Sequence, residues 1–293
     1  MRIGLYNLEP KYRNLALEKI RMYHAGKGHT VCDFTPMEQD NFDVIYASSI
    51  FTFTDKSYVP SRAIVGGTGF DVTTTLPPEI ERMKPKLNMG FTTRGCIRNC
   101  GFCVVPQKEG GIQSVGDIYD LWDGVSETIT LLDNNILALP GHFFKIAAQL
   151  QKERLIVDFN QGLDIRLLTG EMARELKKIR RKRYRFAFDH PGMANTIIEK
   201  VSILKACGIN ASLFYVLCGY DTTFDEDVER LELLRSLGQD AFVMRYNKDD
   251  RRYIPLANWA NYHGYFRKFS CKEFVGENVL GKRGRYRETA NAS

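Results

Sequence analysis

The sequence lacks several features that would place the protein in a specialised class. No apolar run approaches the roughly 20 residues that a membrane-spanning helix needs. The apolar stretch in Met1–Tyr6 is too short for a secretion signal and predicts a first strand, so we expect a cytoplasmic protein without a membrane partner. The cysteines number seven, and an odd count argues against a framework of disulfides.

The composition is that of a globular protein. Hydrophobic residues make up 44% and charged residues 26% of the 293 residues, which excludes disorder along the whole chain. The 18 Phe, 14 Tyr and 2 Trp supply ample material for a core. The formal charge of +6 arises wholly within residues 245–293, and such a basic segment either attracts phosphates or forms a solvated face.

Strand and helix patterns alternate along the first 84 residues. Short strands are predicted at 3–6, 30–34, 43–47 and 63–65, and helical spacing of apolar residues predicts a helix over 14–24. This alternation indicates parallel pairing in a small open sheet. Prolines near residue 84 mark a linker, so we predict a first small α/β domain over 1–84.

A longer alternation follows. Strands are predicted at 87–92, 128–132, 155–159, 184–188, 211–217 and 241–246. Helices are predicted at 115–123, 141–152, 170–182, 193–206, 225–237 and 256–268. The six units predict a partial (β/α)6 TIM-like barrel over 85–246, with functional residues on the loops after the strands. A basic, aromatic C-terminal extension covers 247–293.

Three cysteines follow the first strand of this array in the pattern C-x3-C-x2-C, at Cys96, Cys100 and Cys103. Thiolates bind iron–sulfur clusters, and cysteines this close on a loop can converge on one cluster. A [4Fe–4S] cluster held by three thiolates keeps one iron open to an external ligand. Zinc is the alternative, but a structural zinc site takes four ligands and the next His or Cys downstream is His142.

This pattern, with the aromatic Phe102 before the last cysteine, resembles the radical S-adenosylmethionine (radical SAM) superfamily. The resemblance covers roughly residues 87–246. It implies a [4Fe–4S] cluster on Cys96, Cys100 and Cys103, with S-adenosylmethionine on the open iron. It also implies that a flavodoxin- or ferredoxin-like electron donor reduces the cluster, and that a 5′-deoxyadenosyl radical then abstracts hydrogen from substrate.

The resemblance further implies cofactor contacts at polar residues after the later strands. Asp133 and Asn134 follow the second strand, where an ammonium group would be held, and an N-cap or Asx turn is the alternative. After the third strand, the candidates for ribose and carboxylate binding are Asn160, Gln161, Asp164 and Arg166. A surface ion pair between Asp164 and Arg166 is the alternative for the last two.

Two more strand ends carry candidate residues. Asp189 and His190 follow the fourth strand and could bind cofactor or substrate or relay a proton, although a lone histidine in a loop is more often structural. Val216 and Tyr220 bracket the end of the fifth strand, where the superfamily contacts adenine. Cys218 nearby is expected to be a buried hydrophobic residue. The sequence identifies no catalytic residue.

The first domain is similar in outline to the cobalamin-binding-like Rossmann domain that precedes many radical SAM barrels, through the helix 14–17 and the turn 65–67. Bound cobalamin is disfavoured because the D-x-H-x-x-G pattern is absent and His24 and His29 do not reproduce it. Methylthiotransferases place three cluster cysteines in this region, whereas this chain has only Cys32.

The substrate class stays open among RNA, a peptide and a small molecule. Basic and aromatic residues interleave in Arg251–Tyr253 and Lys282–Arg287, a composition that suits RNA phosphates and stacked bases. The run Arg180–Arg185 closes a predicted helix, so solvated packing is its leading explanation. The alternative function is a non-catalytic iron–sulfur or zinc binding module that acts on nucleic acid through the basic tail.

Overall fold

The computed structural model describes residues 1–276 and has a mixed α/β architecture. It divides into two compact units, the first over Met1–Ser126 and the second from Glu127 onward. The domain boundaries predicted after residues 84 and 246 stay predictions. Among the described residues, no helix has both the length and the hydrophobicity needed to cross a lipid bilayer.

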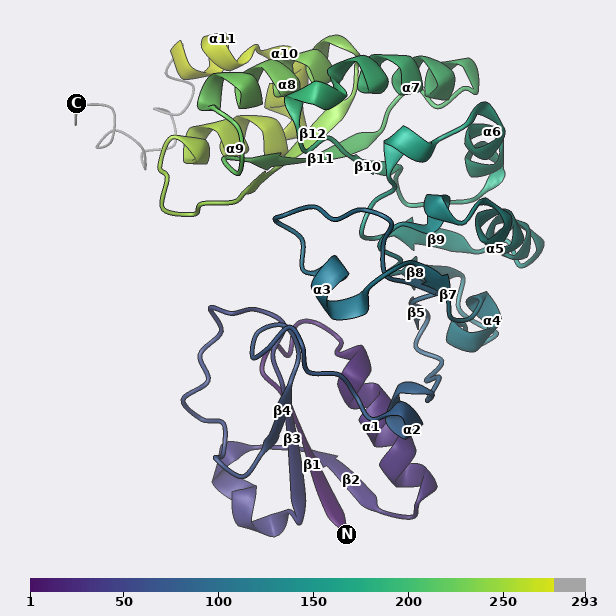
Figure 1. Ribbon diagram of the computed structural model, residues 1–293, viewed down its shortest axis with the longest axis vertical. Coiled ribbons are helices and arrows are strands. Elements are labelled where there is room, and N and C mark those ends of the chain that lie inside the picture. The colour runs from purple at the N-terminus through teal and green to yellow at the C-terminus, as the bar shows by residue number, and fades with distance from the viewer. Residues whose placement is uncertain (277–293) are drawn as a thin grey trace. The chain divides into compact units, whose positions relative to one another are not determined.

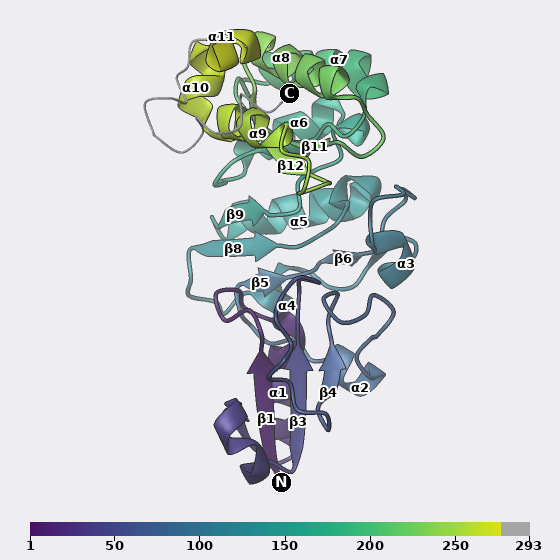
Figure 2. The same cartoon turned by 90° about the vertical axis from the view of Figure 1, so that its left-hand side faces the viewer.

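The first unit contains a four-stranded parallel sheet in the order β2-β1-β3-β4 (Figure 1). Its strands are β1 (Arg2–Asn7), β2 (Thr30–Asp33), β3 (Val44–Ser48) and β4 (Ile64–Gly66). Figure 2 shows β1, β3 and β4 side by side with their arrows pointing the same way. The predicted open parallel sheet is therefore confirmed.

Both faces of this sheet are covered. Helix α1 (Leu15–Gly26) begins at Asn14, whose side chain accepts a hydrogen bond from the Leu17 N–H, and it packs Leu17 and Ile20 on one face. Phe34 and Phe42 form a second apolar cluster with Ile45 of β3. The 3-10 helix η1 (Pro36–Asn41) lies in the connection between β2 and β3.

The rest of the first unit consists of short elements. These are α2 (Pro78–Glu81), β5 (Met89–Gly90), β6 (Thr93–Arg94), α3 (Val105–Glu109), β7 (Gln113–Ser114) and α4 (Ile118–Leu121). The predicted strand over 87–92 is only two residues long, and the predicted helix over 115–123 is a single turn. Gly116 precedes the N-cap Asp117, and Trp122 is already extended, so the helix has no room to grow.

The second unit alternates parallel strands with helices (Figure 1). Strands β8 (Thr128–Leu131) and β9 (Ile156–Phe159) pair in parallel, as do β10 (Arg185–Ala187), β11 (Leu213–Cys218) and β12 (Asp240–Arg245). Isolated parallel bridges join Val157 to Arg181 and Leu163 to Phe186. The bridges thus join β9 to the segment before β10, and β10 to the segment after β9.

The helices between these strands match the predicted positions, except that one of them ends earlier than predicted. They are α5 (Pro140–Lys152), α6 (Gly170–Lys178), α7 (Ala194–Ala206) and α8 (Phe224–Ser236), with the 3-10 turns η2 (Ile136–Ala138), η3 (Ile165–Leu167) and η4 (Pro191–Met193). Helix α6 stops four residues before the predicted 182. Ile179, only 1% exposed, is extended, and the next residues pair with Val157 instead of continuing the helix.

The prediction of one helix over 256–268 is wrong. The segment forms α9 (Tyr253–Asn261) and α10 (His263–Lys268), which are separated by the non-helical Tyr262, and α11 (Cys271–Gly276) follows. Trp259 and Phe266 are fully buried with ring centroids 4.8 Å apart, and both helices pack on β12. The buried aromatic side chains of both helices therefore cover this strand of the sheet.

Candidate functional site

The three predicted cluster cysteines lie on the long connection of the antiparallel β6–β7 hairpin in the first unit. The Cys103 N–H donates to the Cys100 carbonyl at 3.0 Å, which closes a tight turn between these residues. The Arg98 N–H donates to the Cys96 Sγ at 3.3 Å. All three thiols are partly buried and none is in a disulfide, so this loop carries three thiols within eight residues.

The beginning of the loop is fixed to the end of α3. Gly95 has a φ of +79°, and a Cβ on it would lie 2.2 Å from the Gly111 carbonyl oxygen, so only glycine fits. The Gly95 N–H donates to the Glu109 carboxylate at 2.8 Å, and the Cys96 N–H donates to the Gly110 carbonyl at 3.1 Å. Glu109 also pairs with Arg94 at 3.1 Å. The first cysteine therefore starts from a fixed backbone.

The donor set fits an iron–sulfur cluster better than zinc. Thiolate sulfur is the ligand of such clusters, and N–H groups that donate to a ligating sulfur tune a cluster. The Arg98 N–H already donates to the Cys96 Sγ in this loop. Within residues 1–276, no three or more His, Cys, Asp or Glu side chains are arranged as they stand to hold a metal ion. The assignment therefore depends on the spacing and chemistry of the loop. Phe102 is half-buried on the same loop.

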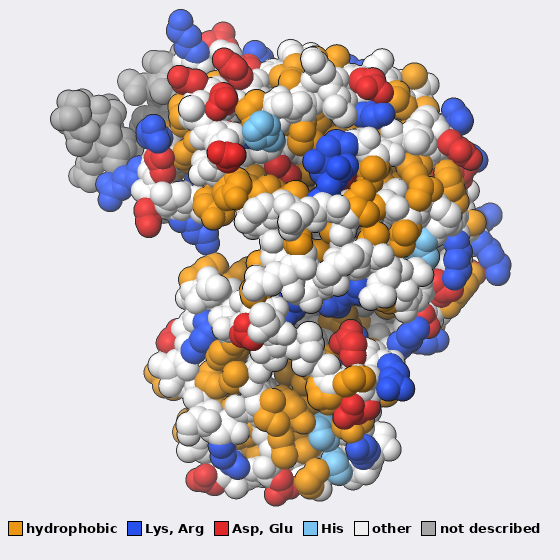
Figure 3. Space-filling view, in the orientation of Figure 1, with side chains coloured by type: hydrophobic (Ala, Val, Ile, Leu, Met, Phe, Trp, Pro, Cys, Tyr) orange, Lys and Arg blue, Asp and Glu red, His pale blue; other side chains and the backbone are white. Residues whose placement is uncertain are grey.

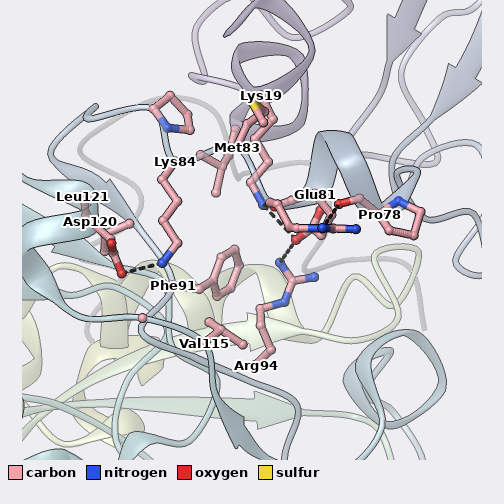
Figure 4. Close-up of a pocket in the computed structure, with 14 residues that line it drawn as sticks. Lys19, Pro78, Glu81, Met83, Lys84, Phe91, Arg94, Val115, Asp120 and Leu121 are labelled. Atoms are coloured by element: carbon pink, nitrogen blue, oxygen red, sulfur yellow. Dashed lines mark hydrogen bonds and ion pairs between the residues drawn. The ribbon is translucent and has the colours of Figure 1, made fainter. Parts of the chain in front are cut away.

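A cavity of about 390 Å³, which the sequence did not indicate, lies beside the strand that leads into this loop (Figure 4). That volume falls within the range of small-molecule sites. The Arg94 guanidinium lies 4.3 Å from the centroid of the Phe91 ring, and both side chains line the cavity. Ion pairs join other lining residues, Lys19 to Glu81 and Lys84 to Asp120, each at 2.7 Å. Arg94 thus belongs both to the cavity wall and to the support of the cysteine loop.

In the second unit, buried polar residues follow β8 and β9. Asp133 is 4% and Asn135 is 2% exposed, and the Asn135 side chain donates to Asp164 at 3.4 Å. Asp133 and Asn134 cap no helix, because Asn135 precedes η2 and Leu139 precedes α5. Neither residue therefore occupies an N-cap position, the Asx turn stays an alternative prediction, and Asn134 is half-buried.

Asp164 and Arg166 form an ion pair. The Arg166 guanidinium donates to both carboxylate oxygens of Asp164, at 2.6 and 3.0 Å. The ion pair of the alternative interpretation is therefore present, but it is partly buried, because the Arg166 side chain is 32% exposed and Asp164 is only 9% exposed. Asn160 and Gln161 lie on the exposed turn between β9 and Asp164, and the Tyr215 hydroxyl donates to the Asn160 carbonyl at 3.2 Å.

Asp189 follows β10 and is half-buried. Desolvation raises the pKa of the Asp189 carboxyl group above its ordinary value. The hydrogen bond from the Leu217 N–H and the positive charges of Arg230 and Arg166 act to lower this pKa, but desolvation outweighs them. The negative charge of Asp164 adds to the rise. The structure therefore brings Asp164, Arg166 and Asp189 into one electrostatic group at the ends of β9 and β10.

The other strand-end candidates have different surroundings. His190 is exposed, and its Nδ1 accepts the Gly192 N–H at 3.0 Å as the N-cap of η4, which is a local structural role. Val216 is fully buried in β11. Tyr220 is 39% exposed and meets Tyr246 edge-on with ring centroids 4.8 Å apart. Cys218 is buried as expected.

The sequence analysis missed a buried ion pair on α8. Asp227 and Arg230 are 0% and 2% exposed, and the Arg230 guanidinium donates to Asp227 and to the Phe188 carbonyl, and to the Leu217 carbonyl at 2.7 Å. Asp227 also accepts the Tyr253 hydroxyl at 2.8 Å. The pair therefore holds the ends of β10 and β11 together. Its signal was the spacing of Asp227 and Arg230 on the helix face that also carries buried leucines.

The basic run over 180–185 has structural partners. Arg183 pairs with the buried Asp240, and Arg185 pairs with Asp158. Packing thus explains this run better than ligand binding does. The second basic group of the tail, Lys282–Arg287, lies outside the described residues.

Comparison with known protein families finds no family model that matches this chain, and a search of curated proteins finds no match either. The functional assignment therefore rests on the residues described above.

Proposed function

We propose that the protein is a radical SAM enzyme whose [4Fe–4S] cluster is held by Cys96, Cys100 and Cys103. The observation that carries the proposal is the C-x3-C-x2-C loop, anchored at Gly95, with three partly buried thiols outside any disulfide. When bound, the cluster and S-adenosylmethionine supply the radical chemistry, with electrons from a flavodoxin- or ferredoxin-like donor.

The tasks of the protein's own residues are binding and orientation. The Arg98 N–H adjusts the electron density on the Cys96 sulfur, and the Gly95 turn directs the loop away from β6. We assign the cofactor's polar groups to Asp133, Asn134, Asn160, Gln161, Asp164 and Arg166, its adenine to Val216 and Tyr220, and a proton-holding role to Asp189. The raised pKa of Asp189 supports that last role.

The proposal includes a partial (β/α)6 barrel. Support comes from β8 to β12, which are joined in sequence order by parallel pairing or bridges and alternate with helices. In such a barrel the loops after the strands carry the functional residues. The polar groups after β8, β9 and β10 occupy this position.

The test is anaerobic reconstitution of the full chain with iron and sulfide. We expect about four irons and four sulfides per chain, and 5′-deoxyadenosine or methionine after reduction with dithionite in the presence of S-adenosylmethionine. Cys96→Ser, Cys100→Ser and Cys103→Ser should each lower the iron content. Cys32→Ser is the matched control, because this partly buried cysteine of β2 lies outside the loop and should leave iron unchanged.

Two outcomes would contradict the proposal. One bound zinc in place of iron would favour the non-catalytic binding module. A complete cluster that never cleaves S-adenosylmethionine on reduction would show that the loop serves another purpose, such as electron transfer alone.

A further inference from the structure

The cavity of about 390 Å³ beside β6 has an apolar centre. Apolar side chains from distant segments of the first unit line it, among them Leu15, Met83, Phe91, Val115 and Leu121. Val115 is 39% and Leu121 is 7% exposed, so the lining includes both surface and core residues. A hollow of this volume with an apolar lining is typical of small-molecule sites. In the described part of the chain, its lining includes none of the residues assigned above to the cluster or to S-adenosylmethionine.

The charged groups around this apolar centre neutralise one another in pairs. Lys19 pairs with Glu81 and Lys84 pairs with Asp120, each at 2.7 Å. Figure 4 shows Lys84 with Asp120 on one side of the Phe91 ring and Glu81 on the other. An ionic ligand would have to compete with these pairs, whereas an uncharged ligand leaves them intact. Figure 3 shows basic and acidic side chains interspersed on the visible face of the first unit, a pattern that steers ions of neither sign.

The two arginines of the lining are engaged as well. The Arg94 guanidinium pairs with Glu109 at 3.1 Å and lies 4.3 Å from the centroid of the Phe91 ring. Arg82 is exposed, so water screens its charge, and its Nε donates to the Pro78 carbonyl at 3.2 Å. The lining therefore favours an uncharged, mainly apolar ligand over an ion of either sign.

Two carboxylates of the lining can each accept a further hydrogen bond. The Lys19 ammonium donates to Oε1 of Glu81 at 2.7 Å. The Lys84 ammonium and the Asp117 N–H both donate to Oδ2 of Asp120, at 2.7 and 3.1 Å. Within residues 1–276, the hydrogen bonds of both carboxylates use only these oxygens. The second oxygen of each can therefore accept a hydroxyl or N–H group of a ligand.

Arg94 connects the cavity to the cysteine loop. Its guanidinium packs on Phe91 in the cavity wall and pairs with Glu109. The Glu109 carboxylate also accepts the Gly95 N–H at 2.8 Å, and Gly95 directly precedes Cys96. A ligand that packs against this wall binds best to the arrangement in which Glu109 holds the start of the loop. By linkage, the ligand stabilises that arrangement.

We propose that the cavity binds an uncharged, mainly apolar small molecule with a hydroxyl or N–H group at each end, and that this ligand stabilises the start of the cysteine loop. The end groups donate to Glu81 and Asp120, and the body of the molecule contacts Phe91, Val115 and Leu121. The proposal goes beyond the radical chemistry, because neither the binding nor the effect on the loop needs a cluster or S-adenosylmethionine.

The test titrates the full chain, free of cluster, with 2,6-dihydroxynaphthalene at pH 7, an uncharged probe with a hydroxyl at each end. Calorimetry should give a dissociation constant of about 0.1–1 mM, as expected for a ligand of about 12 non-hydrogen atoms. The compound 2,6-dimethoxynaphthalene cannot donate a hydrogen bond and should bind about 10-fold more weakly. Naphthalene-2,6-disulfonate has the same ring system but two negative charges, and it should also bind more weakly than the dihydroxy probe.

Matched variants locate the site. Val115→Trp puts a bulky side chain into the cavity and should abolish binding of the probe. Val125→Trp is the control, because Val125 is 87% exposed in the same unit and does not line the cavity, so it should bind like the original chain. Glu81→Ala should weaken the dihydroxy probe but not the dimethoxy compound. Circular dichroism of each variant checks that the fold is kept.

The effect on the loop is measured by the reaction of its thiols with Ellman's reagent. Cys32→Ser and Cys207→Ser in all variants remove the other two partly buried thiols, so the remaining fast reaction belongs to the loop. Saturating probe should slow this reaction at least about 5-fold. Glu109→Ala, at a residue outside the lining, should remove the slowing and weaken the probe, because linkage is reciprocal.

Four results would overturn the proposal. The first is no binding of the dihydroxy probe at millimolar concentration. The second is binding that Val115→Trp leaves unchanged, which would place the probe elsewhere. The third is tighter binding of the disulfonate, which would make the cavity an anion site. The fourth is probe binding that leaves the thiol reaction unchanged, which would refute the link to the loop. None of these depends on iron, so they stand apart from the tests of the proposed function.

Discussion

Replacement of Arg230 by methionine should destabilise the second unit strongly. The side chain is 2% exposed and pairs with Asp227, which has no exposed surface. It also donates to the carbonyls of Phe188 and Leu217 at the ends of β10 and β11. Arg230→Met keeps most of the apolar volume but leaves a buried carboxylate without its counter-charge and two carbonyls without this donor.

The expected cost is about 3–5 kcal/mol, the usual effect of breaking a buried ion pair by removing one partner. With a urea dependence of about 2 kcal/mol per molar, the unfolding midpoint should fall by about 1.5–2.5 M. The double variant Asp227→Asn, Arg230→Met should be more stable than Arg230→Met alone, because no unpaired charge then stays buried.

Urea unfolding followed by the fluorescence of Trp259 measures this effect. Trp259 is fully buried in the second unit, and Trp122→Phe in all variants removes the signal of the first unit. The control is Arg235→Met on the same helix, because Arg235 is 31% exposed in its pair with Glu232 and should cost less than about 1 kcal/mol. Equal costs for Arg230→Met and Arg235→Met would refute the reasoning.

Two further predictions concern the first unit. Glu9→Gln should cost about 1.5–3 kcal/mol, since Glu9 accepts several hydrogen bonds as a buried anion. Burial acts to raise the pKa of Glu9, but the hydrogen bonds from Thr54, Ile50 and Ser49 outweigh it and hold the pKa below its ordinary 4.5. The stabilisation by ionised Glu9 is therefore complete above pH 4.5 and is lost as the pH falls through the lowered pKa. The difference in free energy of unfolding between the original chain and Glu9→Gln should therefore shrink at acid pH. Urea unfolding at several pH values, followed by the fluorescence of Trp122, measures this difference. Gly95→Ala should lower the iron bound after reconstitution. Gly111→Ala should keep it, because Gly111 lies on the same connection but has no left-handed φ and open space around it. Equal iron in both would show that the Gly95 turn does not position the cysteines.

Patterns of local spacing predicted most of the fold. Apart from β5, β6 and β7, the strands of both units lie within one or two residues of the predicted positions, and so do the helices α5, α7 and α8, each of which buries apolar residues at helical spacing. The errors arose where tertiary contacts override local preference. Residues 180–182 had helical composition but pair with Val157, and the break at Tyr262 lets Trp259 and Phe266 both face the core.

The candidate site was predictable only in part. The cysteine spacing and the polar residues after the strands are visible in the sequence, and the structure brings Asp164, Arg166 and Asp189 together as parallel strands require. The buried pair on α8 was missed because Asp227 follows two other acidic residues, and acidic side chains are also common at the start of exposed helices. The cavity beside Arg94 depends on residues distant in sequence, so no local pattern indicated it.

The two buried cysteines of the protein differ in reactivity from the partly buried ones. Desolvation raises the pKa of Cys218 to about 12 and that of Cys271 to about 11. The deprotonated thiolate is the form of cysteine that attacks electrophiles and binds metal. Both side chains are therefore unreactive at neutral pH. Iron and sulfide delivered to the folded chain therefore find no competing thiolate at these two positions. Mispaired disulfides and misplaced iron are accordingly disfavoured at these two positions, and alkylation of the native protein should leave both cysteines unlabelled.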